Sequence, residues 1–252
     1  MDLGMDGRVV LVTGATGGIG RAVAHAYAAA GARVAVAYRS NAGLAAKLVA
    51  ELGGEERACA VPYALDDPQS PRRAVAEVEA RWGAVDVLVA NAVRWGERRV
   101  PGTAFEEVPE ESWLPVIEDN LAPAIRTVQS VVGGMRARGW GRIVLISSHN
   151  ALGGNRGQEF YGAAKAGLHG LARSLMWDLT GTGVLVNVVC PGLTSTERVT
   201  TGLPEPIRER ERAGTPTGRL SSPEDVARAV LFLGSDANGN VTGEALTVAG
   251  GR

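Results

Sequence analysis

Short β-branched runs alternate with longer alanine-rich segments along the whole chain, and this alternation constrains its fold more than any other feature. Seven runs have the composition of strands: Arg8–Thr13, Arg33–Tyr38, Arg57–Tyr63, Val85–Ala90, Arg142–Ser147, Val184–Val189 and Ala245–Val248. Six segments space their apolar residues like helices: Gly18–Ala30, Ala42–Leu52, Pro68–Trp82, Pro109–Arg138, Gln158–Thr180 and Pro223–Leu233. Strands that are apolar on both faces need a helix layer on each face to shield them from water. The alternation of such strands with helices therefore predicts an α/β fold. We expect a doubly wound, seven-stranded, mostly parallel sheet with helices on both faces.

The domain organisation follows from the lack of any linker. No low-complexity stretch, charge block or internal repeat divides the chain, so we expect a single domain over residues 1–252. Two long segments, Ala92–Val108 and Pro191–Ser222, are expected to be loops that follow the C-terminal ends of strands. Ligands bind at that edge of a parallel sheet, so we expect residues 191–222 to form a substrate lid. Its charge-alternating run Ile207–Arg212 is expected to be a solvated helix, with a recognition patch as the alternative.

Charge and composition exclude several classes of partner. The 26 basic and 27 acidic side chains give a net charge of −1, so no overall field would attract nucleic acid or an acidic membrane. No apolar run approaches the ~18 residues of a membrane span, and the N-terminus lacks the basic region of an export signal. Cys59 and Cys190 both lie in strand-like apolar runs, which is typical of buried thiols in a reducing compartment. We therefore expect a cytoplasmic protein with no nucleic-acid or membrane partner.

The first predicted strand leads into a glycine-rich turn, Thr13–Gly20, that opens the first helix. Glycines let the backbone approach a phosphate, and the free N–H groups of a helix N-terminus attract its negative charge. Gly14, Gly18 and Gly20 follow the spacing Thr-Gly-x-x-x-Gly-x-Gly, with Thr16 where Gly-x-Gly-x-x-Gly would have its second glycine. The position of this turn predicts a dinucleotide site, whereas glycines alone would indicate only a turn.

A second group of polar residues indicates proton transfer. Tyr161 and Lys165 are four positions apart at the start of a predicted helix, so their side chains share one face. An ammonium group beside a phenol stabilises the phenolate, so we expect the pKa of Tyr161 to fall below its usual ~10. Ser148 ends a predicted strand 13 residues earlier, where its hydroxyl can donate to a developing oxyanion. Together the three residues predict an acid–base site at the ligand edge of the sheet.

The order of these motifs resembles the short-chain dehydrogenase/reductase family over essentially the whole chain. The resemblance rests on Thr13–Gly20, Asn91-Ala92, Asn120, Ser148, Tyr161-x-x-x-Lys165, Asn187, Pro191-Gly192, Val241-Thr242-Gly243 and Gly250-Gly251. The stretches Gly141–Val144 and Tyr161–Gly167 are similar to the ketoacyl-reductase branch.

This resemblance implies a Rossmann domain and an oxidoreductase that interconverts a small-molecule ketone and its alcohol. It implies that Tyr161 is the general acid or base and that Ser148 positions the carbonyl. Lys165 would tune Tyr161 and hold the nicotinamide ribose, and Asn120 would anchor a water relay.

The resemblance also assigns cofactor-binding residues: Gly14, Thr16, Gly18, Ile19, Gly20, Tyr38, Arg39, Ser40, Leu65, Asn91, Ala92, Lys165, Pro191, Gly192 and Thr194. An NAD enzyme would carry an acidic residue at the end of the second strand, where this chain has Tyr38. Arg39 and Ser40 follow it and offer a guanidinium and a hydroxyl, with no carboxylate to repel a 2′-phosphate. We therefore expect NADP(H), with a simply solvated Arg39 as the alternative.

Val93 and Ala64 depart from the family pattern, whereas Pro123 fits the irregular helix of the family. Val93 replaces a glycine near the expected cofactor and changes the pocket shape there. Ala64 stands where family members commonly have an aspartate that binds the adenine amino group, so we expect backbone groups to hold the adenine here. Pro123 has no backbone N–H, and we expect it to distort the helix near Asn120.

The expected pocket rim mixes flat apolar faces with hydrogen-bonding groups: Trp95, His149, Asn155, Gln158, Phe160 and Leu193. This lining favours a free cyclic or polyfunctional ketone, because a bare alkyl chain would leave polar groups unpaired. The first alternative is a carrier-bound 3-oxoacyl chain. Reductases of such chains tend to present basic residues to the acidic carrier, and Gly139-Trp140 and Thr180–Gly183 offer none at the usual places, although Arg136 and Arg138 lie close by.

Two other classes of function remain as alternatives. A non-catalytic dinucleotide sensor or scaffold would need no tuned phenol, and a sugar-nucleotide epimerase or dehydratase would normally need a longer C-terminal region. The sequence spacing shows no metal-ligand cluster, so we expect no metal.

The remaining conspicuous residues are expected to have structural roles. His25 and His169 lie in alanine- and leucine-rich helices, where we expect core or interface positions. The arginines near Trp95, namely Arg94, Arg98 and Arg99, are expected to be solvated, with contact to a substrate carboxylate as the alternative. The helix Gln158–Thr180 has a wider apolar surface than one stripe because of Leu168, Leu171, Leu175 and Met176. That surface and the family resemblance lead us to expect a homotetramer.

Overall fold

The computed structural model describes residues 3–96 and 98–252. Met1 and Asp2, at the start of the chain, and Glu97, in the first predicted loop, lie outside the described residues. One seven-stranded sheet runs through the described chain in the order β3-β2-β1-β4-β5-β6-β7, and its strand pairs are all parallel. The strands are β1 Val9–Thr13, β2 Arg33–Tyr38, β3 Ala58–Pro62, β4 Val87–Ala90, β5 Gly141–Ile146, β6 Val184–Pro191 and β7 Ala245–Val248. The expected doubly wound α/β fold is confirmed.

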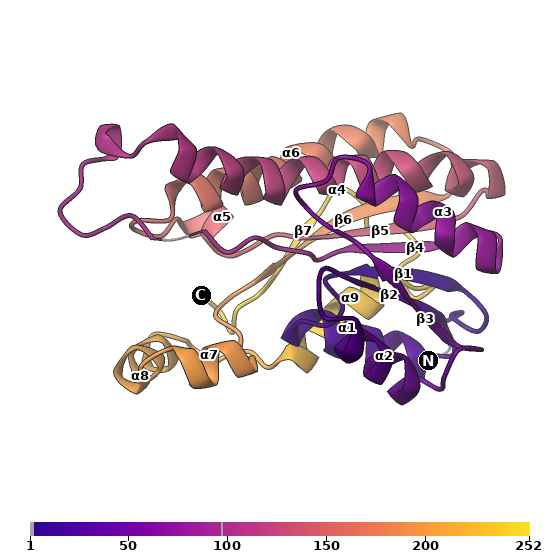
Figure 1. The fold of residues 1–252 in the computed structure, drawn as a ribbon, viewed down its shortest axis with the longest axis horizontal. Helices are drawn as coiled ribbons and strands as arrows, with labels where there is room; N and C mark the ends of the chain where they lie inside the picture. Colours follow the sequence, from indigo (N-terminus) through magenta and orange to yellow (C-terminus); the bar gives the residue numbers. More distant parts are fainter. Residues whose placement is uncertain (1–2, 97) are drawn as a thin grey trace.

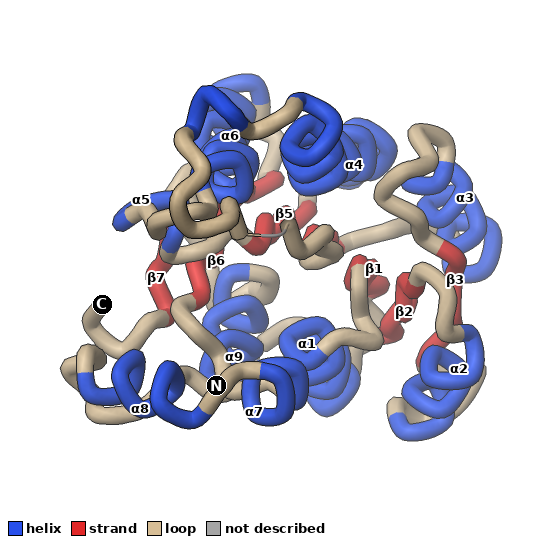
Figure 2. The backbone as a smooth tube through the Cα atoms, turned by 60° about the vertical axis from the view of Figure 1, so that its left-hand side comes forward, coloured by secondary structure: helices blue, strands red, loops and turns tan. Residues whose placement is uncertain are grey.

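Helices cover both faces of the sheet (Figure 1). One layer holds α3 Ser70–Trp82, α4 Glu110–Arg138 and α6 Glu159–Asp178, and the other holds α1 Gly18–Ala29, α2 Ala42–Glu51 and α9 Pro223–Leu233. Figure 2 shows the same two layers with the strands between them. Each layer buries its own apolar core against the sheet: Val78, Met135 and Leu168 belong to the first, and Val23 and Leu48 to the second. None of the described helices is long and apolar enough to cross a membrane.

The strand order reverses between β1 and β4, because β1 pairs with β2 on one side and with β4 on the other. The chain leaves β1 into α1 on one face and leaves β4 toward α4 on the opposite face. A reversal of this kind opens a crevice at the C-terminal ends of the strands, where ligands of such sheets bind. The predicted site residues follow those strand ends.

Four short helices lie in segments that we expected to be loops or the connections that precede a longer helix. They are η1 Phe105–Glu107, α5 Asn150–Gly153, α7 Glu197–Gly202 and α8 Glu205–Ala213. The expected solvated helix of the lid is confirmed, because α8 has no buried residue. The expected distortion at Pro123 does not end the helix, and α4 stays helical through it. A single proline removes one N–H donor, while the Pro123 carbonyl accepts from the hydroxyls of Thr127 and Tyr63.

Candidate active site

The glycine-rich turn is tied to the end of β4. The backbone N–H groups of Asn91 and Ala92 both donate to the Thr13 hydroxyl at 2.9 Å. The Asn91 side-chain amide donates to the carbonyls of Thr13 at 2.9 Å and Gly14 at 3.2 Å. Gly14 has a φ of +63°, and a Cβ there would lie 2.9 Å from the Ala92 Cα. A Cβ on Gly20 would collide with the Gly14 carbonyl, so both positions require glycine.

The N-terminus of α1 fits a phosphate group. Its N-cap residue, Gly17, makes no side-chain capping bond, so the first N–H groups of the helix are left for another acceptor. Gly17 and Gly18 are exposed, and Thr16 and Ile19 are half-buried beside them. A Cβ on Gly18 would lie 2.6 Å from the Thr196 methyl group, so the start of the lid packs on this turn. This cradle fits the phosphates of a dinucleotide.

Tyr161, Lys165 and Ser148 come together between α6 and the end of β5, as the sequence predicted. The Lys165 ammonium is buried, lies 5.8 Å from the centre of the Tyr161 ring and donates to the Ile146 carbonyl at 2.9 Å. Burial lowers the pKa of Lys165 to about 8. Burial also raises the pKa of Tyr161 to about 12, while a hydrogen bond with Ser148 acts in the opposite direction.

The expectation of a lowered Tyr161 pKa is therefore wrong for this structure. The burial of the phenol outweighs any stabilisation of its charged form, and the Lys165 ammonium is directed at a backbone carbonyl. At neutral pH the Tyr161 hydroxyl keeps its proton, which makes it a donor toward a nearby oxygen.

Asn120 is buried in α4, and its side chain is bonded to protein groups. Its amide donates to the carbonyls of Val116 at 2.9 Å and Arg94 at 2.8 Å, while its carbonyl accepts from the Arg94 N–H at 3.2 Å. Asn120 thereby fixes the loop after β4. A cavity of about 10 Å³ lined by Asn120, Leu65, Ala92 and Lys165 lies next to it, which is about the space that one water requires.

The residues expected to select the cofactor lie at the end of β2. Tyr38 is half-buried, while Arg39 and Ser40 are exposed. Arg39 pairs with Asp66 at 3.3 Å, and the two side chains are 72% and 55% exposed. The expectation that no carboxylate lies here is therefore wrong. β2 and β3 are neighbours in the sheet, so the loop after β3 carries Asp66 to Arg39, which the sequence order of the strands did not reveal.

The end of β6 and the start of the lid carry the last expected cofactor residues. Pro191 and Thr194 are buried, and the Gly192 N–H donates to the Val248 carbonyl at 3.0 Å. The Thr194 hydroxyl donates to the Gly192 carbonyl at 3.0 Å. Pro191 also accepts from the His149 N–H at 2.9 Å, which joins this strand end to the segment after β5.

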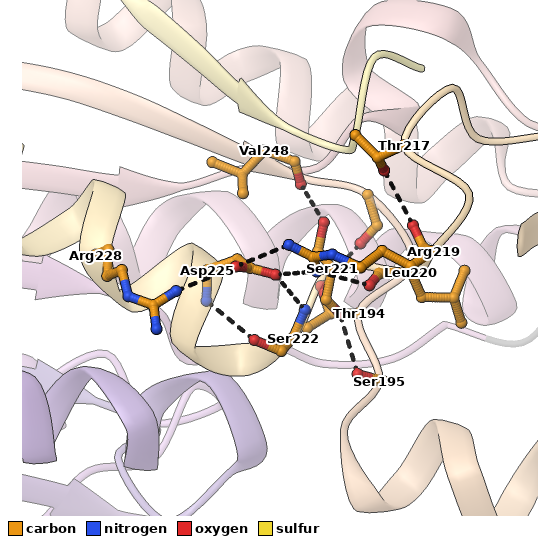
Figure 3. A network of polar contacts seen from close by, with 11 residues as sticks. Thr194, Ser195, Thr217, Arg219, Leu220, Ser221, Ser222, Asp225, Arg228 and Val248 are labelled. Carbon is orange, nitrogen blue, oxygen red and sulfur yellow. Dashed lines mark hydrogen bonds and ion pairs between the residues drawn. The ribbon is translucent and has the colours of Figure 1, made fainter.

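The two ends of the lid segment are joined at its base (Figure 3). Thr194 and Ser221 form a parallel bridge, and the Ser195 N–H donates to the Ser221 carbonyl at 2.8 Å. The Ser221 hydroxyl donates to the Val248 carbonyl at 3.1 Å. Residues 195–220 therefore project from a base that is anchored to β7.

Asp225 organises the side of this base that faces α9. Its carboxylate accepts from the guanidinium groups of Arg219 and Arg228 and from the Ser222 N–H (Figure 3). The hydrogen bond from Arg219 is the main reason that the pKa of Asp225 lies well below its usual range. Ser222 completes a capping box at the start of α9.

The predicted substrate residues divide into two groups. Trp95 stacks on Tyr161 with 5.9 Å between ring centroids, and the Arg198 guanidinium from α7 lies 4.8 Å from the centre of the indole. Leu193 is half-buried at the start of the lid. Arg198 was not predicted from the sequence, because one arginine in a charge-rich lid gives no local signal.

The other four predicted rim residues have protein partners or face solvent. Phe160 stacks with Phe105 at 5.5 Å and with Trp113 at 5.2 Å. The Gln158 side chain accepts from the Asn150 amide at 2.6 Å. The His149 ring packs beside Gly153, and Asn155 is exposed.

Two expectations about basic residues are corrected by the structure. Arg94 and Arg98 are exposed, as expected, although Arg94 also pairs with Asp119 at 2.8 Å, whereas Arg99 is half-buried and pairs with Glu159 at 3.0 Å. Of the two places expected for His25, the subunit core is wrong, while an interface stays a prediction. His25 lies on the surface of α1, 3.3 Å from Glu51 of α2, because its face of α1 points away from the sheet.

His169 lies behind Lys165, in the layer between α6 and the sheet. Its Nε2 lies 2.9 Å from the Ser147 hydroxyl and 3.6 Å from the Cys190 thiol. Both cysteines are free and buried, as expected. Among the described residues, no group of three His, Cys, Asp or Glu side chains is arranged to hold a metal ion.

Comparisons with known proteins agree with this geometry. A family model described as "Enoyl-(Acyl carrier protein) reductase" matches residues 14–252. The acetoacetyl-CoA reductase of Rhizobium meliloti (strain 1021) is 40% identical over 248 residues, which cover 97% of this chain and 98% of that protein. The 3-oxoacyl-[acyl-carrier-protein] reductase FabG of Escherichia coli (strain K12) is 37% identical over 250 residues, or 99% of this chain and 98% of that one.

A solved structure of similar fold is a 7α-hydroxysteroid dehydrogenase complexed with NADH and 7-oxo glycochenodeoxycholic acid. It superposes with a TM-score of 0.90 at 32% sequence identity, covering 99% of this chain and 96% of that one. Together with the glycine cradle and the Ser148, Tyr161 and Lys165 arrangement, these similarities show that the chain belongs to the short-chain dehydrogenase/reductase family of oxidoreductases.

Proposed function

We propose that this protein is an NADP(H)-dependent reductase that converts a ketone to a secondary alcohol, or catalyses the reverse reaction. The observation that carries the proposal is the convergence of Tyr161, Ser148 and Lys165 beside the glycine cradle of a parallel sheet. A non-catalytic sensor would need the cradle but not a buried phenol bonded to a serine.

A nicotinamide dinucleotide would lie along the C-terminal ends of the strands. The residues that would hold it are Gly14, Thr16, Gly18, Ile19, Gly20, Tyr38, Arg39, Ser40, Leu65, Asn91, Ala92, Lys165, Pro191, Gly192 and Thr194. When bound, its nicotinamide supplies or accepts the hydride. The free N–H groups of α1 favour the diphosphate, because they carry partial positive charge.

The preference for NADP(H) would come from Arg39 and Ser40. The Arg39–Asp66 pair is largely exposed, and exposed pairs contribute only ~0–1 kcal/mol, so a 2′-phosphate can compete with Asp66 for the guanidinium. Asp66 would then weaken this preference without reversing it.

The proton chemistry would belong to the protein. The Tyr161 hydroxyl is protonated at neutral pH and would donate its proton to the carbonyl oxygen as negative charge develops there. The Ser148 hydroxyl would donate a hydrogen bond to the same oxygen. The small cavity between Lys165 and Asn120 has room for one water that would return a proton toward Tyr161.

The substrate would be a free cyclic or polyfunctional ketone. Trp95 offers a flat, half-exposed ring next to Tyr161, and the Arg198 guanidinium lies over the same ring as a polar group, which supports a compact, partly polar ligand. The dehydrogenase of similar fold was solved with a steroid, which is a ring ketone.

The second candidate substrate is a 3-oxoacyl thioester, and the names of the similar reductases favour it. Against a carrier-bound form, the usual docking places offer no basic residue, and the two nearest arginines have acidic partners with which the carrier would have to compete. Arg136 bonds to Asp178, and Arg138 lies 3.6 Å from Asp86.

The deciding experiment measures kcat/KM with NADPH for cyclic ketones such as decalone and for a short 3-oxoacyl thioester, both free and carrier-bound. A large preference for the carrier-bound chain would overturn the cyclic-ketone proposal. Tyr161→Phe is expected to lose turnover while NADPH still binds, because only the proton donor is removed. Turnover within tenfold of wild type would refute the role of Tyr161, and NADPH binding without turnover of any ketone by the unaltered protein would favour a sensor.

Three further properties belong to this proposal. We infer a single domain with its lid at about residues 191–222, a cytoplasmic location, and a homotetramer. Leu168 is buried within the subunit, and Leu171, Leu175 and Met176 are partly buried against the hydrophobic core of the same subunit. These four side chains therefore leave less apolar surface on α6 for a second subunit than the sequence suggested. Trp177, 74% exposed at the end of α6, supports a subunit contact there. Light scattering at micromolar concentration tests this, and a monodisperse monomer would contradict it.

A further inference from the structure

The end of β5 and helix α6 are joined by hydrogen bonds just behind the predicted catalytic groups. The Lys165 ammonium donates to the Ile146 carbonyl at 2.9 Å, and the Ser147 hydroxyl donates to the Lys165 carbonyl at 3.0 Å. Ile146 and Ser147 directly precede Ser148, and Lys165 lies one helical turn after Tyr161. These bonds therefore set the spacing between Ser148 and Tyr161.

His169 extends this linkage by one turn of α6. Its Nε2 lies 2.9 Å from the Ser147 hydroxyl oxygen. Ser147 has only one hydroxyl proton, and that proton is used toward the Lys165 carbonyl. The bond to His169 therefore takes its proton from the imidazole, which requires the tautomer protonated at Nε2. Burial lowers the pKa of His169, which keeps the ring neutral with a single N–H.

The surroundings of this pair leave Ser147 little freedom. The Cys190 thiol from β6 lies 3.6 Å from the His169 Nε2. Ser147, Lys165 and Cys190 are buried, and His169 is half-buried. The Ser147 hydroxyl donates one bond to the Lys165 carbonyl and accepts one from His169, so the loss of His169 would leave this buried oxygen without its bonded donor.

We propose that His169 is a positioning residue for ketone reduction, acting through Ser147 to hold Lys165 and the end of β5 in register with Tyr161. The proposal rests on the proposed function, and it assigns His169 no contact with substrate or cofactor. Catalytic groups lose efficiency when they shift by as little as ~0.5–1 Å, so a loose joint between β5 and α6 lowers kcat more than it weakens cofactor binding, to which Lys165 is one contributor among many.

The test compares His169→Leu, His169→Gln and Ser147→Ala with the unaltered protein. We expect His169→Leu to lower kcat about tenfold, the scale of one buried hydrogen bond, with the Kd for NADPH within about twofold. Glutamine can place an amide N–H where Nε2 lies, so His169→Gln is expected to recover most of the loss. The matched control is His25→Gln, since His25 forms only a surface pair with Glu51, and it is expected to keep full activity.

A double-mutant cycle separates positioning from simple destabilisation. If His169 acts through Ser147, Ser147→Ala combined with His169→Leu loses no more kcat than the worse single variant. The proposal would be overturned if the loss of kcat in the double variant equals the product of the losses in the two single variants. A folded His169→Leu protein with kcat within twofold of wild type would overturn it as well. If His169→Leu fails to fold, kcat and the Kd for NADPH of Ser147→Ala and His169→Gln are compared with those of the unaltered protein instead.

A measurement without turnover keeps this inference separate from the proposed function. Nitrogen NMR of labelled histidine is expected to show His169 neutral and protonated at Nε2 near pH 7, with that signal changed by Ser147→Ala. A His169 protonated at Nδ1 would overturn the positioning proposal even if the protein reduces ketones. An unaltered protein that reduces no ketone would instead overturn the proposed function.

Discussion

Trp95 and Tyr161 lie with their rings stacked, 5.9 Å apart between centroids and 21° from parallel. The contact joins the loop after β4 to the first turn of α6, and Arg198 of the lid lies over the same indole. Three segments that are distant in the sequence thus meet at the phenol. Trp95 therefore covers one face of the Tyr161 ring, and we expect it to contact a ligand that binds there.

Trp95→Ala is expected to lower kcat/KM for ketone reduction about three- to tenfold, because an aromatic stack contributes ~0.5–1.5 kcal/mol. Trp95→Phe should retain most of the activity, since it keeps a flat ring beside Tyr161. The thermal stability should change little, because Trp95 is 52% exposed. Steady-state kinetics with several ketones check this, and an alanine variant with unchanged kcat/KM for each of them would speak against the contact.

Lys165→Met is expected to stabilise the fold at pH 7 while abolishing turnover. The pKa of Lys165 falls to about 8 in the folded chain from 10.5, so the folded state binds fewer protons than the unfolded state between these pH values. The stability of the wild type therefore rises with pH across that window, and methionine has no such dependence. The advantage of the variant should be on the order of 2–3 kcal/mol below pH 8 and should shrink toward pH 10. Urea unfolding at both pH values measures it, and a difference that does not depend on pH would contradict the buried charge.

Arg39→Ala is expected to narrow the preference for NADPH over NADH by roughly 1–3 kcal/mol in kcat/KM, the scale of a charge-assisted hydrogen bond. Asp66→Asn should act in the opposite direction, because it releases the Arg39 guanidinium without altering its position at the end of β2. The two variants form a matched pair, because both change only the interaction expected for the 2′-phosphate. The kcat/KM with NADH, which has no 2′-phosphate, should therefore stay near the wild-type value in both. Equal use of NADPH and NADH by the unaltered protein would refute the assignment.

Asp225→Asn is expected to loosen the base of the lid. The amide cannot replace the charge that holds Arg219 and Arg228, and these pairs are largely exposed to solvent, so we expect a loss of about 1 kcal/mol in unfolding free energy and a higher KM for the cofactor. The pKa of Asp225 is depressed in the folded chain, so its contribution is present above the unfolded pKa of ~3.9 and disappears as the pH falls below it. Glu224→Gln is the control, since Glu224 is its exposed neighbour on α9. An Asp225→Asn protein as stable as this control would exclude the role of Asp225.

Local sequence patterns predicted the elements of the fold well. The seven strands and six main helices follow from β-branched runs and from 3.6-residue periodicity, because both signals arise within a few residues of each element. The glycine turn and the Tyr161–Lys165 spacing were equally visible, since each lies within one turn or one helix. These patterns are sufficient to place Gly14, Ser148 and Tyr161 at strand ends or helix starts.

Contacts between elements were beyond the reach of such patterns. Asp66 lies beside Arg39 only because β3 is the neighbour of β2, and Trp95 reaches Tyr161 only because the loop after β4 folds toward α6. The sign of the Tyr161 pKa shift also depended on burial, which the sequence spacing does not measure. The sequence by itself determined which residues form strands, helices and turns, since those preferences are local. Strand order, side-chain burial and the pairings of Arg39, Trp95 and His169 were decided by the tertiary structure, because they depend on how distant segments pack.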